Sequence, residues 1–210
     1  MNTRIELEEE LEVLFEHHAW IGPEYKAGID DQRIAIVGHS HYRKATEPDD
    51  VDFTLNVIRE AMENDSVNFQ NQISGYFGAS NGNFWNRVIF FNFIPECIGS
   101  VDCGRDMKYD GGTPSQIEHG RSRTMRILDM YKPHKVFVFA AATWRKFPAT
   151  REEAANKANH TLIPDCSHSW GTYEFDEHIT VAVRLRHPQG ATKEEMKLAV
   201  KAALAIPYIQ

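Results

Sequence analysis

Two histidines, a hydroxyl and a phenol lie together in the segment Gly38-His39-Ser40-His41-Tyr42. Histidine gains and loses a proton near neutral pH, and a glycine lets the backbone approach a ligand closely. The segment directly follows the apolar run 34–37, in which three of the four residues are β-branched. Such a run predicts a short strand buried on both faces of a parallel sheet. We therefore expect the polar segment at the carboxyl end of a central strand, where open α/β sheets bind ligands.

Other polar and basic residues follow the apolar runs of the sequence. They are Arg43 and Lys44 after the first run, Asn92 after the second, Arg145 and Lys146 after the third, and Arg186 and His187 after the fourth. Because the carboxyl ends of parallel strands share one edge of a sheet, these side chains are expected to converge. The pattern predicts a pocket for an anionic or phosphate-bearing ligand. The alternative is that arginine and lysine only fill solvent-exposed loops.

The hydrophobic pattern predicts the elements that position these residues. Strands are predicted over 33–37, 88–91, 135–140 and 179–185, with an extra antiparallel strand over 170–175. Residues 179–185 alternate apolar and polar side chains, which is typical of a half-exposed edge strand. Helices are predicted over 53–62, 114–131, 149–158 and 192–205, and long loops over 64–83 and 95–112. This order predicts a three-layer α/β/α fold with a mainly parallel, four-stranded sheet.

Length and charge favour a single domain over residues 1–210. The chain has 210 residues, of which 42% are hydrophobic, and a net charge of −7. Residues 1–16 hold six glutamates and one arginine, so much of the negative charge lies there. Leu7, Leu11 and Leu14 recur at helical spacing, and we expect residues 1–30 to form an acidic helical extension packed on the domain. The remaining chain is nearly neutral, which leaves nucleic acid open as a partner.

Cysteine usage and hydropathy bear on the location of the protein. Cys97, Cys103 and Cys166 are an odd number of cysteines and form no CxxC pair, which is more typical of a reduced cytoplasmic protein than of a disulfide scaffold. No apolar run approaches membrane-spanning length, and the first residues lack the basic-then-apolar pattern of a signal peptide. We therefore expect a cytoplasmic protein without a membrane partner.

The strand-end residues resemble, in order, the motifs of the uracil-DNA glycosylase superfamily. The segment Gly38–Tyr42 resembles the water-activating motif Gly-Gln-Asp-Pro-Tyr, and Phe91-Asn92 resembles the strand-ending Leu-Asn whose amide reads uracil. His187-Pro188 resembles the His-Pro of the closing loop, and Phe53 falls about where the family places the phenylalanine that stacks on the flipped base. The similarity extends over roughly residues 33–205, as in a divergent member of the superfamily, and implies a uracil-DNA glycosylase-like fold.

The resemblance implies a DNA-repair hydrolase that cleaves the N-glycosidic bond of uracil or another damaged base. Such an enzyme holds the base outside the stack, with Phe53 as the aromatic face and Asn92 as the amide that reads the base edge. His187 would stabilise the negative charge on the departing base. The pocket would be completed by Gly38, His39 and Tyr42, and the nucleic acid would be contacted by Arg43, Lys44, Arg145, Lys146 and Arg186.

Two departures from the family pattern change the expected chemistry. Ser40 stands where the best-known members have an aspartate that orients or deprotonates water, so His41 or His39 would have to act as the general base. The loop 187–190 lacks the leucine wedge that fills the gap left by a flipped base, so we expect single-stranded DNA, a nucleotide or a modified base as the substrate. Some relatives carry a four-cysteine iron–sulfur cluster, but three cysteines are too few, and we expect no cofactor and no metal. The predicted catalytic set is Ser40, His41 and His187.

Two other functions remain open from the sequence. His39 and His41 form an HxH pair which, together with Asp165, His168 or His160, would bind zinc for hydrolysis. Against this, HxH ligand pairs usually come from alternate strand residues in a barrel larger than this chain allows. The other candidate is a catalytically silent module that binds nucleic acid or a nucleotide and has kept only the fold.

Overall fold

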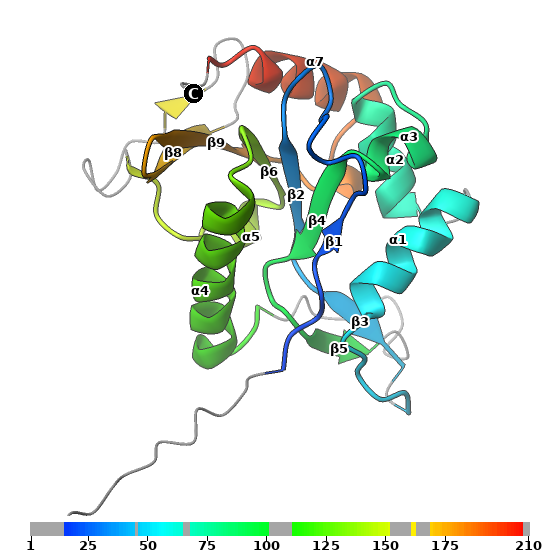
Figure 1. Ribbon diagram of the computed structural model, residues 1–210. Coiled ribbons are helices and arrows are strands. Elements are labelled where there is room, and N and C mark those ends of the chain that lie inside the picture. The colour runs from blue at the N-terminus through cyan, green and yellow to red at the C-terminus, as the bar shows by residue number, and fades with distance from the viewer. Residues whose placement is uncertain are drawn as a thin grey trace, which may run out of the picture.

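A seven-stranded sheet forms the centre of the molecule (Figure 1). The computed structural model describes residues 15–44, 46–64, 68–100, 111–151, 161–162 and 169–207. The strand order is β1-β4-β2-β6-β9-β8-β7, and the strands are β1 (Trp20–Ile21), β2 (Ile34–Gly38), β4 (Val88–Asn92), β6 (Lys135–Phe139), β7 (Thr161–Leu162), β8 (Ser169–Phe175) and β9 (His178–Leu185). Strands β4, β2, β6 and β9 are parallel, whereas β1, β8 and β7 are antiparallel to their neighbours. The mainly parallel α/β sheet is confirmed. It has seven strands: the four predicted for the sheet, the extra antiparallel strand predicted over 170–175, and β1 and β7, which were not predicted.

Strand β2 is central because both of its faces are covered. Its residues Ile34 to Val37 are 0% exposed, and they pair with β4 on one side and β6 on the other. Successive side chains of a strand point to opposite faces, so Ile34 and Ile36 join one apolar cluster while Ala35 and Val37 join another. The continuous apolar run therefore has the buried position that the sequence predicts.

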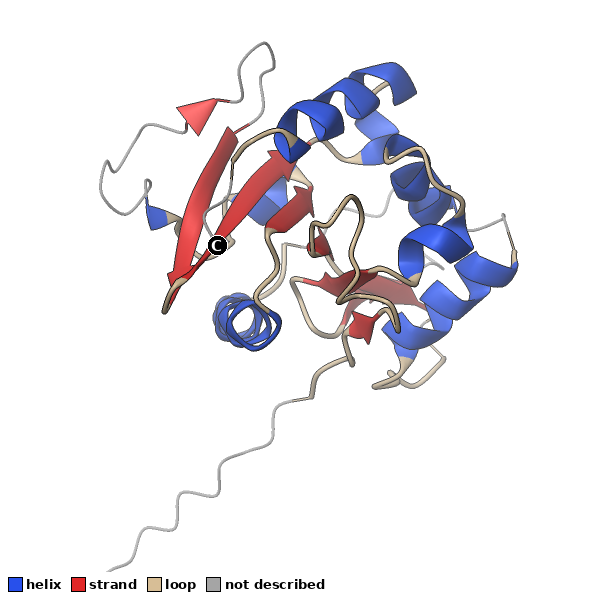
Figure 2. Ribbon diagram, turned by 45° about the horizontal axis from the view of Figure 1, so that its top comes forward, coloured by secondary structure: helices blue, strands red, loops and turns tan. Residues whose placement is uncertain are grey.

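Helices cover both faces of the sheet (Figure 2). One apolar cluster packs the sheet against α1 (Phe53–Glu63), α2 (Asn68–Tyr76), α3 (Asn81–Trp85) and α7 (Lys193–Leu204). The opposite cluster packs it against α4 (Pro114–Tyr131) and α5 (Ala141–Trp144). A separate two-stranded parallel sheet joins β3 (His41–Arg43) to β5 (Cys97–Ser100), and the short helix η2 spans Pro188–Gly190. The described helices and strands thus form three layers.

The predicted helices 53–62, 114–131 and 192–205 are confirmed as α1, α4 and α7. Helix α4 begins with a capping box, in which the Thr113 hydroxyl accepts from the Gln116 backbone N–H and the Gln116 side chain accepts from the Thr113 N–H. Pro114 follows at the first helical position, as the sequence indicates. The antiparallel strand predicted over 170–175 is also confirmed, as β8.

The prediction of a long loop over 64–83 is wrong, because α2 and α3 lie there. Asparagine and glycine are poor helix formers, yet Ile73 and Tyr76 are buried and supply the apolar contacts that hold α2 on the sheet. Asn81 is buried because its amide donates to the Ala61 carbonyl at 2.9 Å and accepts from the Ser74 hydroxyl. Tertiary packing therefore overrides the local composition.

The predicted edge position of residues 179–185 is also wrong, because β9 lies inside the sheet between β6 and β8. The apparent polar position Thr180 is 0% exposed, and its hydroxyl donates to the Pro133 carbonyl at 2.7 Å.

Within residues 15–30 the structure has the strand β1 and turns instead of the predicted helical extension. The first part of that predicted extension, residues 1–14, lies outside the described residues, as does most of the helix predicted over 149–158. In the described ranges, no helix has the length and apolar character that crossing a membrane requires.

Candidate functional site

The sheet reverses its strand order between β2 and β6. The chain moves from β2 outward to β4 on one side, and then to β6 and β9 on the other. The carboxyl ends of β2 and β6 therefore flank a topological switch point, which is where open α/β sheets bind ligands. His39 follows β2 and Thr143 lies in α5, directly after β6. The His39 Nδ1 and Thr143 Oγ1 atoms are 3.0 Å apart in a buried hydrogen bond that links the two sides.

Gly38 and Asn92 are register partners at the carboxyl ends of β2 and β4. A Cβ atom on Gly38 would lie 2.2 Å from Asn92 Oδ1, so only glycine leaves room for this carboxamide. Asn92 is 4% exposed, and its backbone carbonyl accepts a hydrogen bond from Arg123. The buried Asn92 Nδ2 has no hydrogen-bond partner among the described residues. The position predicted to read a base edge thus holds an unused donor.

Ser40 supplies a second unpaired polar atom near this corner of the sheet. Its Oγ is buried without a hydrogen-bond partner among the described residues. The backbone is fixed there, because the Gly38 and His39 carbonyls accept hydrogen bonds from the Phe93 and Ile94 N–H groups at 3.1 and 2.8 Å. Since buried polar groups are nearly always hydrogen-bonded, two unpaired groups on neighbouring strand ends point to a ligand or water there.

His41 and Phe53 lie in an aromatic cluster with His17. The His41 and Phe53 ring centroids are 4.8 Å apart, and His41 Nε2 is 2.9 Å from the Thr54 hydroxyl. Burial, aided by the nearby His17, lowers the pKa of His41 to about 3. The ring is therefore neutral at physiological pH and is a weak proton acceptor, which does not favour its predicted role as a general base. His39 and His41 contact threonines on different elements, α5 and α1, and among the described residues neither belongs to a group of three side chains that could hold a metal ion.

His187 follows β9 and accepts a hydrogen bond from the Gln189 N–H at Nδ1. Desolvation by neighbouring atoms lowers its pKa, although the residue as a whole is exposed. Its ring centroid lies 5.6 Å from that of Phe69 in α2, and Phe69 in turn contacts Phe90 and Phe139. Phe69 is an aromatic residue of this edge that the sequence reasoning missed, because residues 64–83 were expected to be a loop. Its spacing from Ile73, four positions along the chain, was the available signal.

Most of the remaining predicted site residues contact other groups of the protein. Tyr42 packs against Gly99 of β5, where a Cβ would approach the Tyr42 ring to 2.8 Å. Four of the five basic residues that were predicted to contact nucleic acid form contacts within the protein: Arg43 with the Glu47 carbonyl, Lys44 with the Glu47 carboxylate, Lys146 with the Gly111 carbonyl, and Arg186 with Glu195. Arg145 is exposed at the end of α5. A ligand that used the four engaged cations would have to compete with these contacts. Asp165, His168 and His160 lie outside the described residues.

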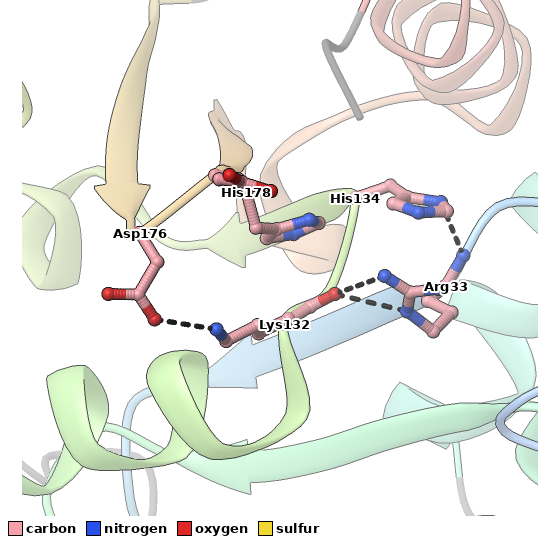
Figure 3. Close-up of a pocket in the computed structure, with 6 residues that line it drawn as sticks. Arg33, Lys132, His134, Asp176 and His178 are labelled. Atoms are coloured by element: carbon pink, nitrogen blue, oxygen red, sulfur yellow. Dashed lines mark hydrogen bonds and ion pairs between the residues drawn. The ribbon is translucent and has the colours of Figure 1, made fainter.

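A pocket of about 500 Å³ lies at the opposite, amino edge of the sheet (Figure 3). Its lining consists of titratable side chains that precede or begin β2, β6 and β9: Arg33, Lys132, His134, Asp176, Glu177 and His178. Much of their bonding capacity is used internally. The Lys132 carbonyl accepts two hydrogen bonds from the Arg33 guanidinium, and the Lys132 ammonium pairs with Asp176 at 3.0 Å. This pocket is separate from the strand ends that carry the predicted site.

Comparisons with known proteins do not assign the chain to a family. No protein-family model matches the sequence, and a comparison with curated proteins found no significant relative. The functional argument therefore rests on the strand-end geometry described above.

Proposed function

We propose that the chain is a uracil-DNA glycosylase-like hydrolase that binds a nucleobase at the carboxyl ends of β2 and β4 and cleaves its N-glycosidic bond. The observation that carries this proposal is the unpaired Asn92 Nδ2, which lies at the end of β4 with its own Oδ1 held against Gly38. A base edge presents the acceptors that such an amide lacks. The resemblance of the strand-end motifs to uracil-DNA glycosylases supports the same assignment.

Residues at the ends of two strands, β4 and β9, would bind the base and assist cleavage of the N-glycosidic bond. Asn92 would read the edge of the base, and His187 would donate a hydrogen bond to the base as negative charge develops on it. The Phe69 ring beside His187 offers an apolar surface at this edge. Ser40 would hold the attacking water through its unpaired hydroxyl, with His39 as the candidate for the proton acceptor because the low pKa of His41 makes that ring a weak base.

The short closing segment favours an accessible base as the substrate. Helix η2 has three residues, Pro188–Gly190, and offers no bulky apolar side chain that would replace a flipped base in a duplex. Uracil or another damaged or modified base in single-stranded DNA, or in a nucleotide, costs less to place in the pocket because it is already unstacked.

A silent nucleobase-binding module is the second candidate, and the environment of His41 favours it. A histidine with a pKa of about 3 is a poor general base, and Ser40 provides no carboxylate in its place. A protein with this site would bind a base through Asn92 without breaking the glycosidic bond.

The test is base release from single-stranded oligonucleotides that carry uracil or other damaged bases, followed by cleavage at abasic sites. Asn92→Ala and His187→Ala are each expected to lower the release rate by about 100-fold, since each removes one hydrogen bond that strengthens in the transition state. Asn56→Ala is the matched control, because Asn56 is exposed on α1 and its side chain accepts a hydrogen bond from Arg59, away from the strand ends.

Binding without release, weakened by Asn92→Ala, would identify the silent module. If the wild-type protein neither releases nor binds any of these bases, both candidates are excluded.

A further inference from the structure

His17, Asp49 and Cys97 come from three separate segments and meet beside the small β3–β5 sheet. His17 lies before β1, Asp49 lies in the loop before α1, and Cys97 is the first residue of β5. An imidazole nitrogen, a carboxylate oxygen and the thiol sulfur of these residues all lie within 4.8 Å of one another. We call this group the His-Asp-Cys cluster. His17 also packs against His41 and Phe53, but Asp49 and Cys97 are not among the predicted strand-end site residues, and the amino-edge pocket includes none of the three.

The cluster is held in place by backbone hydrogen bonds. The His17 N–H donates to the Pro95 carbonyl at 2.7 Å, and the His17 carbonyl accepts a hydrogen bond from the buried Arg123 guanidinium. Asp49 Oδ2 accepts from the Cys97 N–H at 2.8 Å, which orients the carboxylate. His17 itself is 1% exposed. The three side chains therefore have little freedom to lose when they bind a ligand.

The donor types select the class of ion. One imidazole nitrogen, one thiolate and one carboxylate suit zinc and related borderline-soft cations, whereas magnesium and calcium prefer oxygen alone. His17 Nε2 lies 2.7 Å from Asp49 Oδ1, so the nitrogen already points at the carboxylate that would share the ion. The charges also match, because a carboxylate and a thiolate together neutralise a divalent cation, and the site lies between the buried His17 and the partly exposed Asp49 and Cys97.

We propose that His17 Nε2, the Asp49 carboxylate and Cys97 Sγ bind one divalent cation of the zinc class. Binding releases the Cys97 thiol proton to solvent and requires the neutral His17 tautomer with its proton on Nδ1, so that Nε2 is free to bind the ion. Three protein ligands leave a fourth position for water. The ion would join the segment before β1 to the β3–β5 sheet and to the loop before α1. This site is independent of the nucleobase-binding proposal.

The test is metal uptake by the purified full-length protein after treatment with a chelator. Zinc is expected to bind with a stoichiometry of one per chain and to raise the thermal unfolding temperature. Cobalt(II) is expected to give the near-ultraviolet charge-transfer absorption that requires a thiolate ligand. Cys97→Ser should remove that absorption, and Cys97→Ser, Asp49→Asn and His17→Gln should each weaken zinc binding by more than about 100-fold.

His18→Gln is the matched control. His18 also faces an aspartate, with Nδ1 2.8 Å from Asp52, but this pair is exposed and is not part of the His-Asp-Cys cluster. Circular dichroism of each metal-free variant separates lost binding from lost folding, and the conservative Cys97→Ser change keeps the assay interpretable if His17→Gln unfolds. No stoichiometric uptake by the wild type, or zinc binding that persists in folded Cys97→Ser and Asp49→Asn, would mean that the cluster is only a hydrogen-bonded contact and would overturn the proposal.

Discussion

Single residues decide whether the carboxyl edge of the sheet can hold a base. The sequence correctly places Gly38 and Asn92 at strand ends, because apolar runs mark the strands that precede them. It does not predict that the Asn92 carboxamide occupies the space where a Gly38 side chain would stand, since that contact depends on the parallel register of β2 and β4. The low pKa of His41 was also beyond prediction, because it depends on burial by segments far apart in the chain.

The Gly38 contact can be tested by Gly38→Ala. The added methyl group would overlap Asn92 Oδ1, so the amide must move. We expect a loss of about 1–3 kcal/mol in the free energy of unfolding, typical of an overpacked core, together with the loss of base binding. Urea denaturation measures the first effect and oligonucleotide binding the second.

Gly82→Ala is the control for this substitution. Gly82 lies in α3, and an added Cβ there meets no atom within 4 Å. Its stability should stay the same or rise by about 0.5–1 kcal/mol, as expected for alanine in a helix. An equal change in the free energy of unfolding for Gly38→Ala and Gly82→Ala would contradict the steric role of Gly38.

Helices and strands were predicted correctly where the local sequence signals agree with the tertiary packing. Helix α4 has a capping hydroxyl, a proline at its first position and a proline shortly after its end, and its bounds match the prediction. Helix α2 lacks such signals. It is stabilised because residues from other parts of the chain pack around its Ile73 and Tyr76 side chains. The inner position of β9 was missed for a similar reason, because the partner that buries Thr180 is the distant Pro133 carbonyl.

The capping box of α4 gives a prediction about one element. Thr113→Ala removes the oxygen that accepts from the Gln116 N–H, and it should lower the free energy of unfolding by about 1 kcal/mol. Ser115→Ala is the comparison, since Ser115 is exposed in the first turn of the same helix. Chemical denaturation of both variants measures the free energy of unfolding. An equal decrease in Ser115→Ala and Thr113→Ala would argue against a stabilising role of the Thr113 cap.

At the scale of the whole molecule, the two edges of the sheet have different characters. The carboxyl edge carries unpaired polar atoms, whereas the amino edge carries a pocket in which charged groups contact one another. Only the carboxyl edge was predicted to bind a ligand, because basic residues follow several strands there. Arg33, His134 and His178 precede or begin strands, and nothing in their spacing indicates that they meet.

The amino edge should make the stability of the whole protein depend on pH. Burial and the nearby Arg33, His178 and Lys135 lower the pKa of His134 from 6.5 to about 4. As the pH falls below 6.5, His134 takes up a proton in the unfolded chain but stays neutral in the folded protein until the pH approaches 4. Stability is therefore complete above pH 6.5 and is lost between pH 6.5 and about 4, by about 2 kcal/mol after allowance for solvent screening.

Urea denaturation across this pH range measures the effect, with His134→Asn as the comparison. The Asn side-chain oxygen can replace His134 Nδ1 as the acceptor for the Arg33 N–H but does not titrate. The pH dependence should become shallower in this variant. An unchanged slope would show that His134 does not contribute to it.

The outermost strands, β1 and β7, are each two residues long. Strand β1 lies along β4, whose residues are all buried, and the Trp20 indole fixes it by donating to the Trp85 carbonyl at 2.7 Å. A short outer strand offers few free backbone groups to a second molecule, which is how many proteins avoid edge-to-edge aggregation. Loss of β1 would leave the five-residue apolar strand β4 as an outer strand with unpaired backbone groups, which is the kind of edge along which a second chain can pair.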